Sequence, residues 1–297
     1  MNESSPSRSA RLRAMLRERA VVMPGAFNAL TARAIEQAGF EAIYLSGGAL
    51  ANSMVGMPDV GLTTLSEAAY HATRCAAVTT VPIISDADTG FGGAENAART
   101  VEEFERAGLS GLHLEDQEFP KRCGHLSGKQ VVPVNEFCEK IAAAEAARRD
   151  PDFLLIARTD ARGVTSYDDA VARAHAYLKA GADMIFPEAL QGREEFERFA
   201  RDVPVPLLAN MTEFGRTPYL PVDEFAAMGY RIVIFPVTLQ RIAMQAVIDA
   251  LAVLRREGTQ KELLSRMQTR KELYELLGYA EGRQSLPQSE SGSEPRT

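Results

Sequence analysis

The chain has 297 residues, of which 45% are hydrophobic, enough for one large domain or two small ones, so a tiny disulfide-stapled module is excluded. With 33 basic and 40 acidic side chains the net charge is −7, which gives no broad positive field for nucleic acid. The three cysteines are scattered, there is no apolar signal core at the start, and no apolar run approaches the ~20 residues of a membrane helix. We expect a soluble protein of the reducing cytoplasm with no membrane partner.

Both ends of the chain are poor in side chains that form cores. Residues 1–10 are rich in serine, and residues 281–297 contain almost no apolar side chain that could offset the entropy cost of ordering. We expect these two tails to be disordered and residues 11–280 to form a single domain.

Between the tails, short apolar runs alternate with longer amphipathic stretches. The runs centre near Val22, Ile43, Ile83, Leu112, Leu155, Ile185, Leu207 and Val233. Glycines that are expected to end helices in the left-handed conformation precede four of them, at Gly39, Gly108, Gly181 and Gly229. Eight such strands at ~250 residues predict an α/β fold, a (β/α)8 TIM barrel, with an open doubly wound sheet as the alternative.

The last apolar run is followed by more helix than a barrel requires. Two amphipathic stretches, 239–256 and 261–277, come after it, whereas the last barrel unit needs one helix. We expect these additional C-terminal helices to pack on a partner subunit.

The residues that follow the apolar runs are candidates for an active site, because parallel barrels place their sites at the C-terminal ends of the strands. These residues are unusually polar in this chain and include Ser46, Gly47, Gly48, Asp86, Asp88, Glu115, Arg158, Glu188, Asn210, Met211 and Thr212. Strand ends meet water and are often polar, but the joint pattern predicts a single site.

A metal site is indicated by Asp86 and Asp88, which stand two residues apart at a strand end and are predicted to face the same way. At ~5 Å the two carboxylates would repel each other by about 3 kcal/mol, and a cation would relieve this repulsion. Ligands that offer only oxygen suit Mg²⁺ or Mn²⁺ rather than zinc. Asp59 and Glu115 are candidates to accept hydrogen bonds from metal-bound water. The alternative is that the aspartates cap the following helix.

The segment Lys121–His125 surrounds Cys123 with cations, which stabilise a thiolate. A bound anionic substrate would instead favour the protonated thiol, so the roles of nucleophile and proton donor both remain open. Zinc is not indicated, because no second pair of ligands follows at the required spacing. The other cysteines and histidines are expected to be structural, namely Cys75, Cys138, His71, His113 and His175.

Nine segments carry a resemblance to a known family. They are YLSGGAL at 44–50, GMPDVG at 56–61, DADTGFG at 86–92, HLEDQ at 113–117, KRCGHLSGK at 121–129, ARTDA at 157–161, FPEA at 186–189, LLANMTEFG at 207–215 and MQTRKELYE at 267–275. Through them residues 10–280 resemble the isocitrate lyase and phosphoenolpyruvate mutase superfamily, and most closely its 2-methylisocitrate lyases. The resemblance implies a (β/α)8 barrel that exchanges its terminal helix within a homotetramer.

The resemblance also implies the reaction, a Mg²⁺-dependent cleavage of (2S,3R)-2-methylisocitrate to pyruvate and succinate in the methylcitrate cycle of propionate catabolism. By motif, Asp86 and Asp88 would hold the metal, with Asp59 and Glu115 in its outer shell. The catalytic residues would be Tyr44 as base and Cys123 as acid, with Lys121 and His125 tuning the thiol. The substrate would be bound by Ser46, Gly47, Gly48, Cys123, Gly124, Arg158, Glu188, Asn210, Met211, Thr212, Arg241 and Arg270.

Specificity for the methylated substrate is expected from an apolar niche of Phe186, Ile234 and Pro236, which could alternatively be ordinary core. Other functions stay open. Carboxyphosphonoenolpyruvate phosphonomutases share KRCGHL and LLANM, whereas TEFGRTPYL and MQTRKELYE favour the lyase. Another 2-hydroxy-dicarboxylate lyase is also possible by motif. A catalytically silent oligomeric scaffold is a different class, and the retained polar ring argues against it.

Overall fold

The computed structural model describes residues 6–124 and 128–279. Within these ranges, eight parallel strands form one sheet in the order β1-β8-β7-β6-β5-β4-β3-β2. The strands are β1 (Val21–Pro24), β2 (Ile43–Leu45), β3 (Ile83–Asp86), β4 (Gly111–Glu115), β5 (Leu154–Thr159), β6 (Met184–Pro187), β7 (Leu207–Asn210) and β8 (Tyr230–Phe235). Each predicted apolar run lies in one of these strands, which confirms the sequence prediction.

The sheet closes on itself between β1 and β2. Gly25 forms a parallel bridge with Tyr44, and the Ala26 N–H donates to the Tyr44 carbonyl at 2.9 Å. Only glycine fits at position 25, because a Cβ there would lie 2.0 Å from the Pro236 carbonyl oxygen. The fold is therefore the predicted (β/α)8 barrel and not the open sheet.

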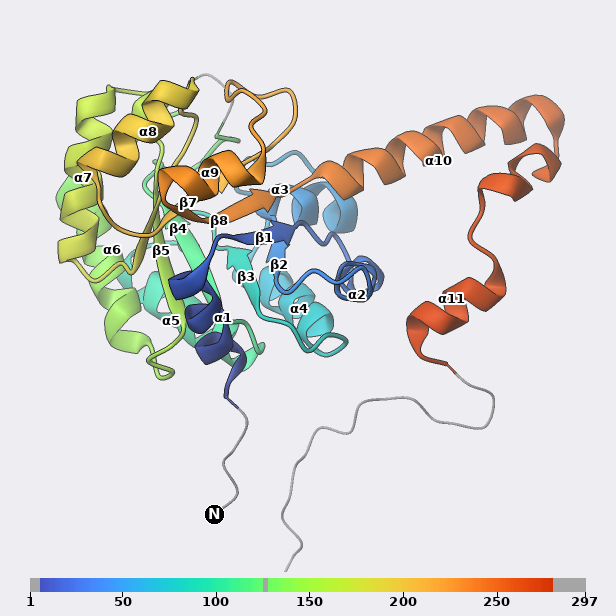
Figure 1. The fold of residues 1–297 in the computed structure, drawn as a ribbon, viewed down its shortest axis with the longest axis horizontal. Coiled ribbons are helices and arrows are strands. Elements are labelled where there is room, and N and C mark those ends of the chain that lie inside the picture. Colours follow the sequence, from blue (N-terminus) through green and yellow to red (C-terminus); the bar gives the residue numbers. More distant parts are fainter. Residues whose placement is uncertain (1–5, 125–127, 280–297) are drawn as a thin grey trace, which may run out of the picture. The chain divides into compact units, whose positions relative to one another are not determined.

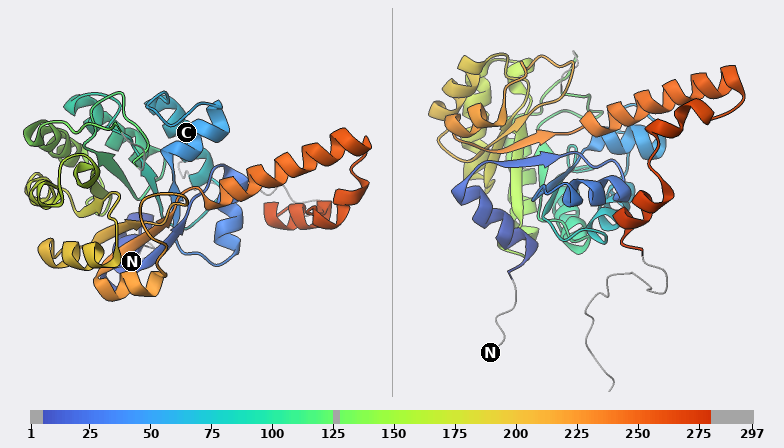
Figure 2. Two further views of the ribbon diagram at one scale, coloured as in Figure 1. Left: turned by 90° about the horizontal axis from the view of Figure 1, so that it is seen from above. Right: turned by 45° about the vertical axis from the view of Figure 1, so that its right-hand side comes forward.

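Helices alternate with the strands, and most of those between β1 and β8 lie around the outside of the barrel (Figures 1 and 2). They are α1 (Arg8–Glu18), α2 (Ala29–Gln37), α3 (Gly47–Leu50), the π-helix η1 (Ala51–Val55), α4 (Leu65–Ala76), α5 (Ala94–Arg106), α6 (Val134–Ala147), the 3₁₀ helix η2 (Ala161–Gly163), α7 (Tyr167–Lys179), α8 (Arg193–Asp202), α9 (Val222–Met228) and α10 (Thr238–Glu257). The four predicted helix-ending glycines have positive φ angles, from +86° at Gly108 to +117° at Gly181.

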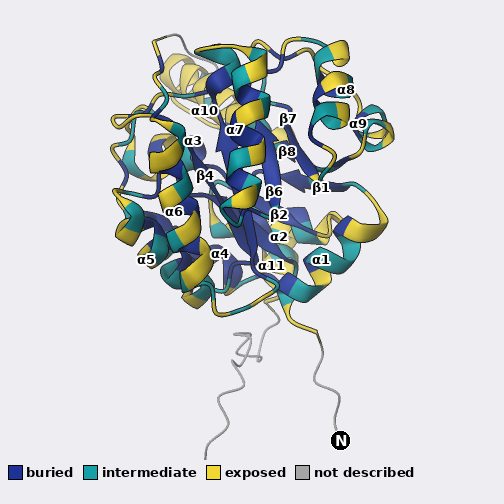
Figure 3. Ribbon diagram, turned by 90° about the vertical axis from the view of Figure 1, so that its left-hand side faces the viewer, coloured by how far each residue is buried: buried dark blue, intermediate teal, exposed yellow. Residues whose placement is uncertain are grey.

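Two apolar cores hold the barrel together, one between the strands and the surrounding helices and one inside the barrel. Figure 3 shows that the strands are buried. The inner core includes Ile84, Ile156 and Ile234, and Leu12 and Leu16 of α1 pack against it. Helix α1 begins at Arg8, inside the range 1–10 that composition assigns to a tail, because these two leucines anchor it. Residues 1–5 and 280–297 lie outside the described residues.

Among the described residues, 248–279 form a second compact unit, and the first unit ends at Val247. The second unit contains the end of α10, the 3₁₀ helix η3 (Lys261–Arg266) and α11 (Arg270–Leu277). The predicted helix 261–277 is thus two elements, because Thr269 starts a new helix: its hydroxyl accepts the Glu272 N–H at 3.2 Å. Among the described residues, no helix has the length and apolar character needed to cross a membrane.

Candidate active site

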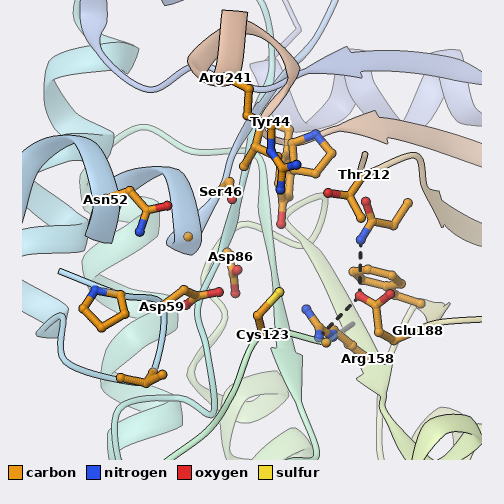
Figure 4. Close-up of a pocket in the computed structure, with 18 residues that line it drawn as sticks. Tyr44, Ser46, Asn52, Asp59, Asp86, Cys123, Arg158, Glu188, Thr212 and Arg241 are labelled. Atoms are coloured by element: carbon orange, nitrogen blue, oxygen red, sulfur yellow. Dashed lines mark hydrogen bonds and ion pairs between the residues drawn. The ribbon is translucent and has the colours of Figure 1, made fainter. Parts of the chain in front are cut away.

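A cavity of about 310 Å³ lies where the strands end at their carboxyl side (Figure 4). Its lining includes most predicted site residues: Tyr44, Ser46, Gly48, Asp59, Asp86, Cys123, Gly124, Arg158, Glu188, Asn210, Thr212 and Arg241. Residues of seven different strand ends and loops thus meet at one place. The candidate methyl-contacting residues Phe186 and Pro236 line it too.

Other predicted residues lie elsewhere. Met211 is a correction, because its side chain is buried in the core between strands and helices and does not line the cavity, and its N–H donates to the Ile234 carbonyl of β8 at 2.9 Å. Ile234 is a second correction, since it belongs to the core inside the strands and does not line the cavity. Arg270 lies in the C-terminal unit, on α11. His125 lies outside the described residues.

Lining residues that the sequence did not single out are Asn52, Pro58, Val60 and Val237. Asn52 belongs to the π-helix η1, and its side-chain Nδ2 donates to the Met57 carbonyl at 2.8 Å. Short π-helical segments occur often at functional sites.

Asp86 and Asp88 come together for a different reason than strand alternation. Asp88 has a φ of +46°, so the chain turns after β3, and the Asp88 N–H donates to Asp86 Oδ1 at 2.9 Å. Both carboxylates face the backbone of Gly47, where a Cβ would lie 2.9 Å from Asp86 Oδ2 and 3.2 Å from Asp88 Oδ1. Gly47 is therefore needed to leave room for the two carboxylates.

Lys121 neutralises part of this acidic cluster. Its Nζ pairs with Asp88 Oδ1 at 2.7 Å and also with Asp59 Oδ1. Burial raises the pKa of Asp88 to about 6, although the nearby Lys121 ammonium opposes the change. Burial also raises the pKa of Glu115 well above its ordinary value. Desolvation is the main cause of both shifts, so the nearby cations do not fully offset the burial of these two carboxylates.

The residues present fit a hydrated divalent cation. One oxygen of Glu115, Oε1, is buried without a hydrogen-bond partner among the described residues. Within that part of the chain, no group of three or more His, Cys, Asp and Glu side chains is arranged to hold a metal by itself. An ion bound by Asp86 and Asp88 would therefore need water ligands, which Mg²⁺ retains more readily than other biological cations.

His113 lies under the cavity and was missed as a site residue. The Tyr44 hydroxyl is 2.8 Å from His113 Nε2, and His113 Nδ1 is 3.7 Å from Asp86 Oδ1. Burial lowers the pKa of His113 to about 3 and raises the pKa of Tyr44 well above 10. Both groups are neutral at neutral pH, so the phenol can donate to the imidazole. The signal was the alternation of His113 with Glu115 on β4, which puts both on the inward face.

Arg158 is held on several sides before any substrate binds. Its Nε donates to Asp160 Oδ2 at 2.9 Å, while its Nη atoms lie 3.2 Å from Glu115 Oε2 and 3.3 Å from Glu188 Oε2. The guanidinium also stacks over Phe186, with 5.1 Å from Cζ to the ring centroid. These contacts fix the direction in which the guanidinium faces the cavity.

The thiol lies between the acidic and the basic side of the cavity. Figure 4 shows Cys123 between Asp86 and Arg158. The next residue, Gly124, packs so closely on the barrel that a Cβ there would lie 2.3 Å from Arg158 Nη2 and 2.7 Å from Glu188 Cγ. A side chain at position 124 would therefore displace Arg158. Cation site, thiol and guanidinium share one small cavity, which can hold a polyanionic substrate and supply it with a proton.

Such a site at the mouth of a (β/α)8 barrel defines an enzyme that acts on a small anionic substrate. The chain belongs to the phosphoenolpyruvate phosphomutase family, whose sequence model matches residues 12–255. A 2-methylisocitrate lyase of Aeropyrum pernix is 52% identical over 269 residues, which cover 90% of this chain and 86% of the relative.

Solved structures of the same superfamily match over nearly the whole length. A 2,3-dimethylmalate lyase has a TM-score of 0.88 and 37% identity, and the match covers 93% of both chains. An oxaloacetate acetylhydrolase has a TM-score of 0.87 and 37% identity, covering 92% of this chain and 93% of the other. The superfamily predicted from the sequence motifs is thereby confirmed.

Proposed function

We propose that the protein is a carbon–carbon lyase that cleaves 2-methylisocitrate to pyruvate and succinate. The observation that carries this proposal is the single cavity in which Cys123 lies between the acidic cluster and Arg158. The reaction needs these three elements, because a hydroxyl must lose a proton, a carbanion must gain one, and several carboxylates must be bound. The identity of 52% to a relative that carries this name supports the choice of substrate.

Arg158 and Arg241 line the cavity and can bind substrate carboxylates through paired hydrogen bonds. Arg158 is oriented beforehand by Asp160, Glu115 and Glu188, so little side-chain entropy is lost when it binds. The Arg241 guanidinium is held by Glu213, because its Nη1 donates to the Glu213 carbonyl at 3.3 Å. Asn210 adds an amide whose Oδ1 is buried without a hydrogen-bond partner among the described residues.

The proton steps are assigned to Tyr44 and Cys123. The substrate hydroxyl proton must leave as the carbon–carbon bond breaks and the hydroxyl carbon becomes the carbonyl of pyruvate. Tyr44 is neutral, so it can accept this proton only while passing its own to His113 Nε2, which lies 2.8 Å from the hydroxyl. The electron pair of the broken bond stays on the succinate fragment, and the Cys123 thiol then gives that carbon its proton.

The cofactor is proposed to be Mg²⁺, or Mn²⁺ in its place, held by Asp86 and Asp88 with Asp59 and Glu115 accepting hydrogen bonds from its waters. A divalent cation supplies Lewis acidity, which stabilises negative charge on oxygen. Lys121 holds Asp59 and Asp88 in place. Buried Glu115 and Asp88 are the groups whose raised pKa values a cation would bring down.

Turnover with a panel of acids tests the function. Protein with Mg²⁺ is incubated with 2-methylisocitrate, isocitrate, 2,3-dimethylmalate or oxaloacetate, and the released pyruvate, glyoxylate and oxalate are measured. We expect pyruvate from 2-methylisocitrate at the highest catalytic efficiency. Highest efficiency on 2,3-dimethylmalate or oxaloacetate would move the protein to one of the activities named for its structural neighbours, and no turnover would contradict the lyase.

We also propose that the enzyme is a cytoplasmic homotetramer whose subunits exchange their C-terminal helices. The support comes from the second unit by itself, where apolar side chains are exposed, among them Ile248, Leu251, Leu264 and Met267. Light scattering after size-exclusion chromatography tests the assembly. A monomer at micromolar concentration would contradict it.

A further inference from the structure

The two residues that flank Cys123 are each held by a buried side chain. On one side, Gln117 makes two hydrogen bonds with the backbone of Arg122: Nε2 donates to the carbonyl at 2.8 Å and Oε1 accepts the N–H at 2.9 Å. On the other side, Lys129 Nζ donates to the Gly124 carbonyl. The backbone that carries the thiol is therefore fixed by side chains rather than by a helix or strand.

Lys129 is linked to the barrel through Asp160. Its side chain is 2% exposed, and its Nζ lies 2.5 Å from Asp160 Oδ1, whose side chain is fully buried. The same carboxylate accepts from Arg158, at 2.9 Å from Nε and 3.2 Å from Nη2. The Asp160 N–H in turn donates to Asp116 Oδ1 at 2.8 Å, which fixes the backbone that carries the Asp160 carboxylate. One carboxylate thus holds both the substrate-facing guanidinium and Lys129.

The contact of Lys129 with Gly124 connects the Asp160 carboxylate to the residue that follows Cys123. Gly124 lies against Arg158, where only a glycine fits, and Lys129 draws its carbonyl toward the carboxylate that orients Arg158. Buried ion pairs are often no better for stability than apolar side chains of the same size. The position of the pair, beside the thiol, therefore points to geometry and not to stability as its role.

We propose that Lys129 is a positioning residue that, together with Asp160, sets the place of the Cys123 thiol relative to Arg158. The inference rests on the proposed function, because it concerns the group that protonates the product carbanion. Misplacing a reacting group by about 1 Å can reduce a rate by roughly 100-fold. Loss of the Lys129 contact is therefore expected to lower kcat and to leave substrate affinity nearly unchanged.

The test compares Lys129→Met with Arg148→Met. Arg148 is a matched control, because it also joins a carboxylate and a carbonyl: Nη1 lies 2.6 Å from Asp183 Oδ2 and 3.0 Å from the Phe153 carbonyl. It does so at the opposite, amino-terminal end of β5 and β6. We expect kcat to fall about 10- to 100-fold in Lys129→Met with KM within about threefold, and to stay within about threefold in Arg148→Met. Equal losses of kcat in the two variants would overturn the proposal.

Conservative and opposite-flank variants keep the test decisive. Lys129→Arg retains donors and should recover part of kcat, whereas Lys129→Met should not. If Lys129→Met does not fold, Gln117→Leu removes the anchor on the other flank and is expected to lower kcat in the same way. Unchanged kcat in folded Gln117→Leu would then overturn the proposal.

Hydrogen–deuterium exchange separates this inference from the proposed function, since it needs no substrate. Peptides that include residues 117–124 should exchange at least about threefold faster in Lys129→Met than in the unmodified protein, because the segment opens more often once the Gly124 carbonyl is no longer held. In Arg148→Met these peptides should exchange at the unmodified rate. Unchanged exchange in Lys129→Met would overturn the positioning role even if the enzyme proves to act on another acid.

Discussion

The Tyr44 hydroxyl lies 2.8 Å from His113 Nε2, and the two rings are stacked with their planes 9° apart. His113 is fully buried, and its ring nitrogens lie close to two residues of the cavity lining, Nε2 to Tyr44 and Nδ1, at 3.7 Å, to Asp86. Burial raises the pKa of Tyr44 and lowers that of His113, so the phenol can act as a base only in concert with transfer of its own proton to the imidazole.

This pair predicts shared effects of mutation. His113→Phe keeps an aromatic ring but loses the nitrogen, and Tyr44→Phe keeps the ring but loses the hydroxyl. Each is expected to lower kcat by at least about 10-fold, and the double variant should lose no more than the worse single variant, because the two groups act as a unit. Pyruvate release measures kcat. Losses that multiply in the double variant would show that the two residues act independently.

Replacement of the thiol tests the proton donor. Cys123→Ser retains the size of the side chain but offers a much weaker acid, so kcat should fall by about 10²- to 10⁴-fold while substrate still binds. Cys138→Ser is a suitable control, since Cys138 is partly buried on α6 and packs against the outer core. If Cys123→Ser keeps more than about a tenth of the rate, the thiol only contacts substrate.

Removal of a carboxylate tests the cation site. Asp88→Ala is expected to abolish Mg²⁺ binding and cleavage and to leave the circular dichroism spectrum unchanged, because the loss affects a strand end and not the core. Mg²⁺ affinity is measured by isothermal titration calorimetry. Chelator should stop the unmodified enzyme, and added Mg²⁺ should restore it. Full turnover in chelator-treated protein would contradict a metal role.

Much of this molecule follows from its sequence pattern. The strands were predictable because each is a short run of apolar residues, and strands of a barrel are buried on both faces. The strand order and the location of the site followed from the barrel topology, so residues as distant in sequence as Ser46 and Thr212 could be assigned to one cavity.

Depth along the barrel axis was harder to predict. Alternation along β8 correctly turns Ile234 inward, but Ile234 lies one layer below the cavity and Pro236 lines it. The turn at Asp88 was also not predicted, because residues other than glycine seldom take a positive φ and the local sequence favours continued strand alternation. The roles of Gln117 and Lys129 depend on contacts across the fold, and no local periodicity encodes those contacts.

A histidine away from the site gives a pH prediction. Burial lowers the pKa of His71 below 6.5, so the unfolded chain binds this proton at a higher pH than the folded protein does. The stability from neutral His71 is therefore present above about pH 6.5 and is lost as pH falls through the folded pKa. The unfolding free energy, from urea titration, should fall between pH 7.5 and 5.5 more steeply in the unmodified protein than in His71→Gln.

Substrate preference provides the last prediction. Phe186, Pro236 and Val237 are apolar groups on the cavity wall, and one of them is expected to contact the methyl group that distinguishes 2-methylisocitrate from isocitrate. One methyl in an apolar pocket is worth about 1–3 kcal/mol, so catalytic efficiency should favour the methylated acid by roughly 10- to 200-fold.

Ile234→Ala tests whether the core residue below the cavity affects this preference. Because Ile234 is 1% exposed inside the barrel, the variant should lose about 2–5 kcal/mol of stability and keep its preference. Val237→Thr, nearly equal in size but polar, should instead reduce the preference with little loss of stability. Equal efficiencies on the two acids in the unmodified enzyme would reject the methyl contact while leaving carbon–carbon cleavage in place.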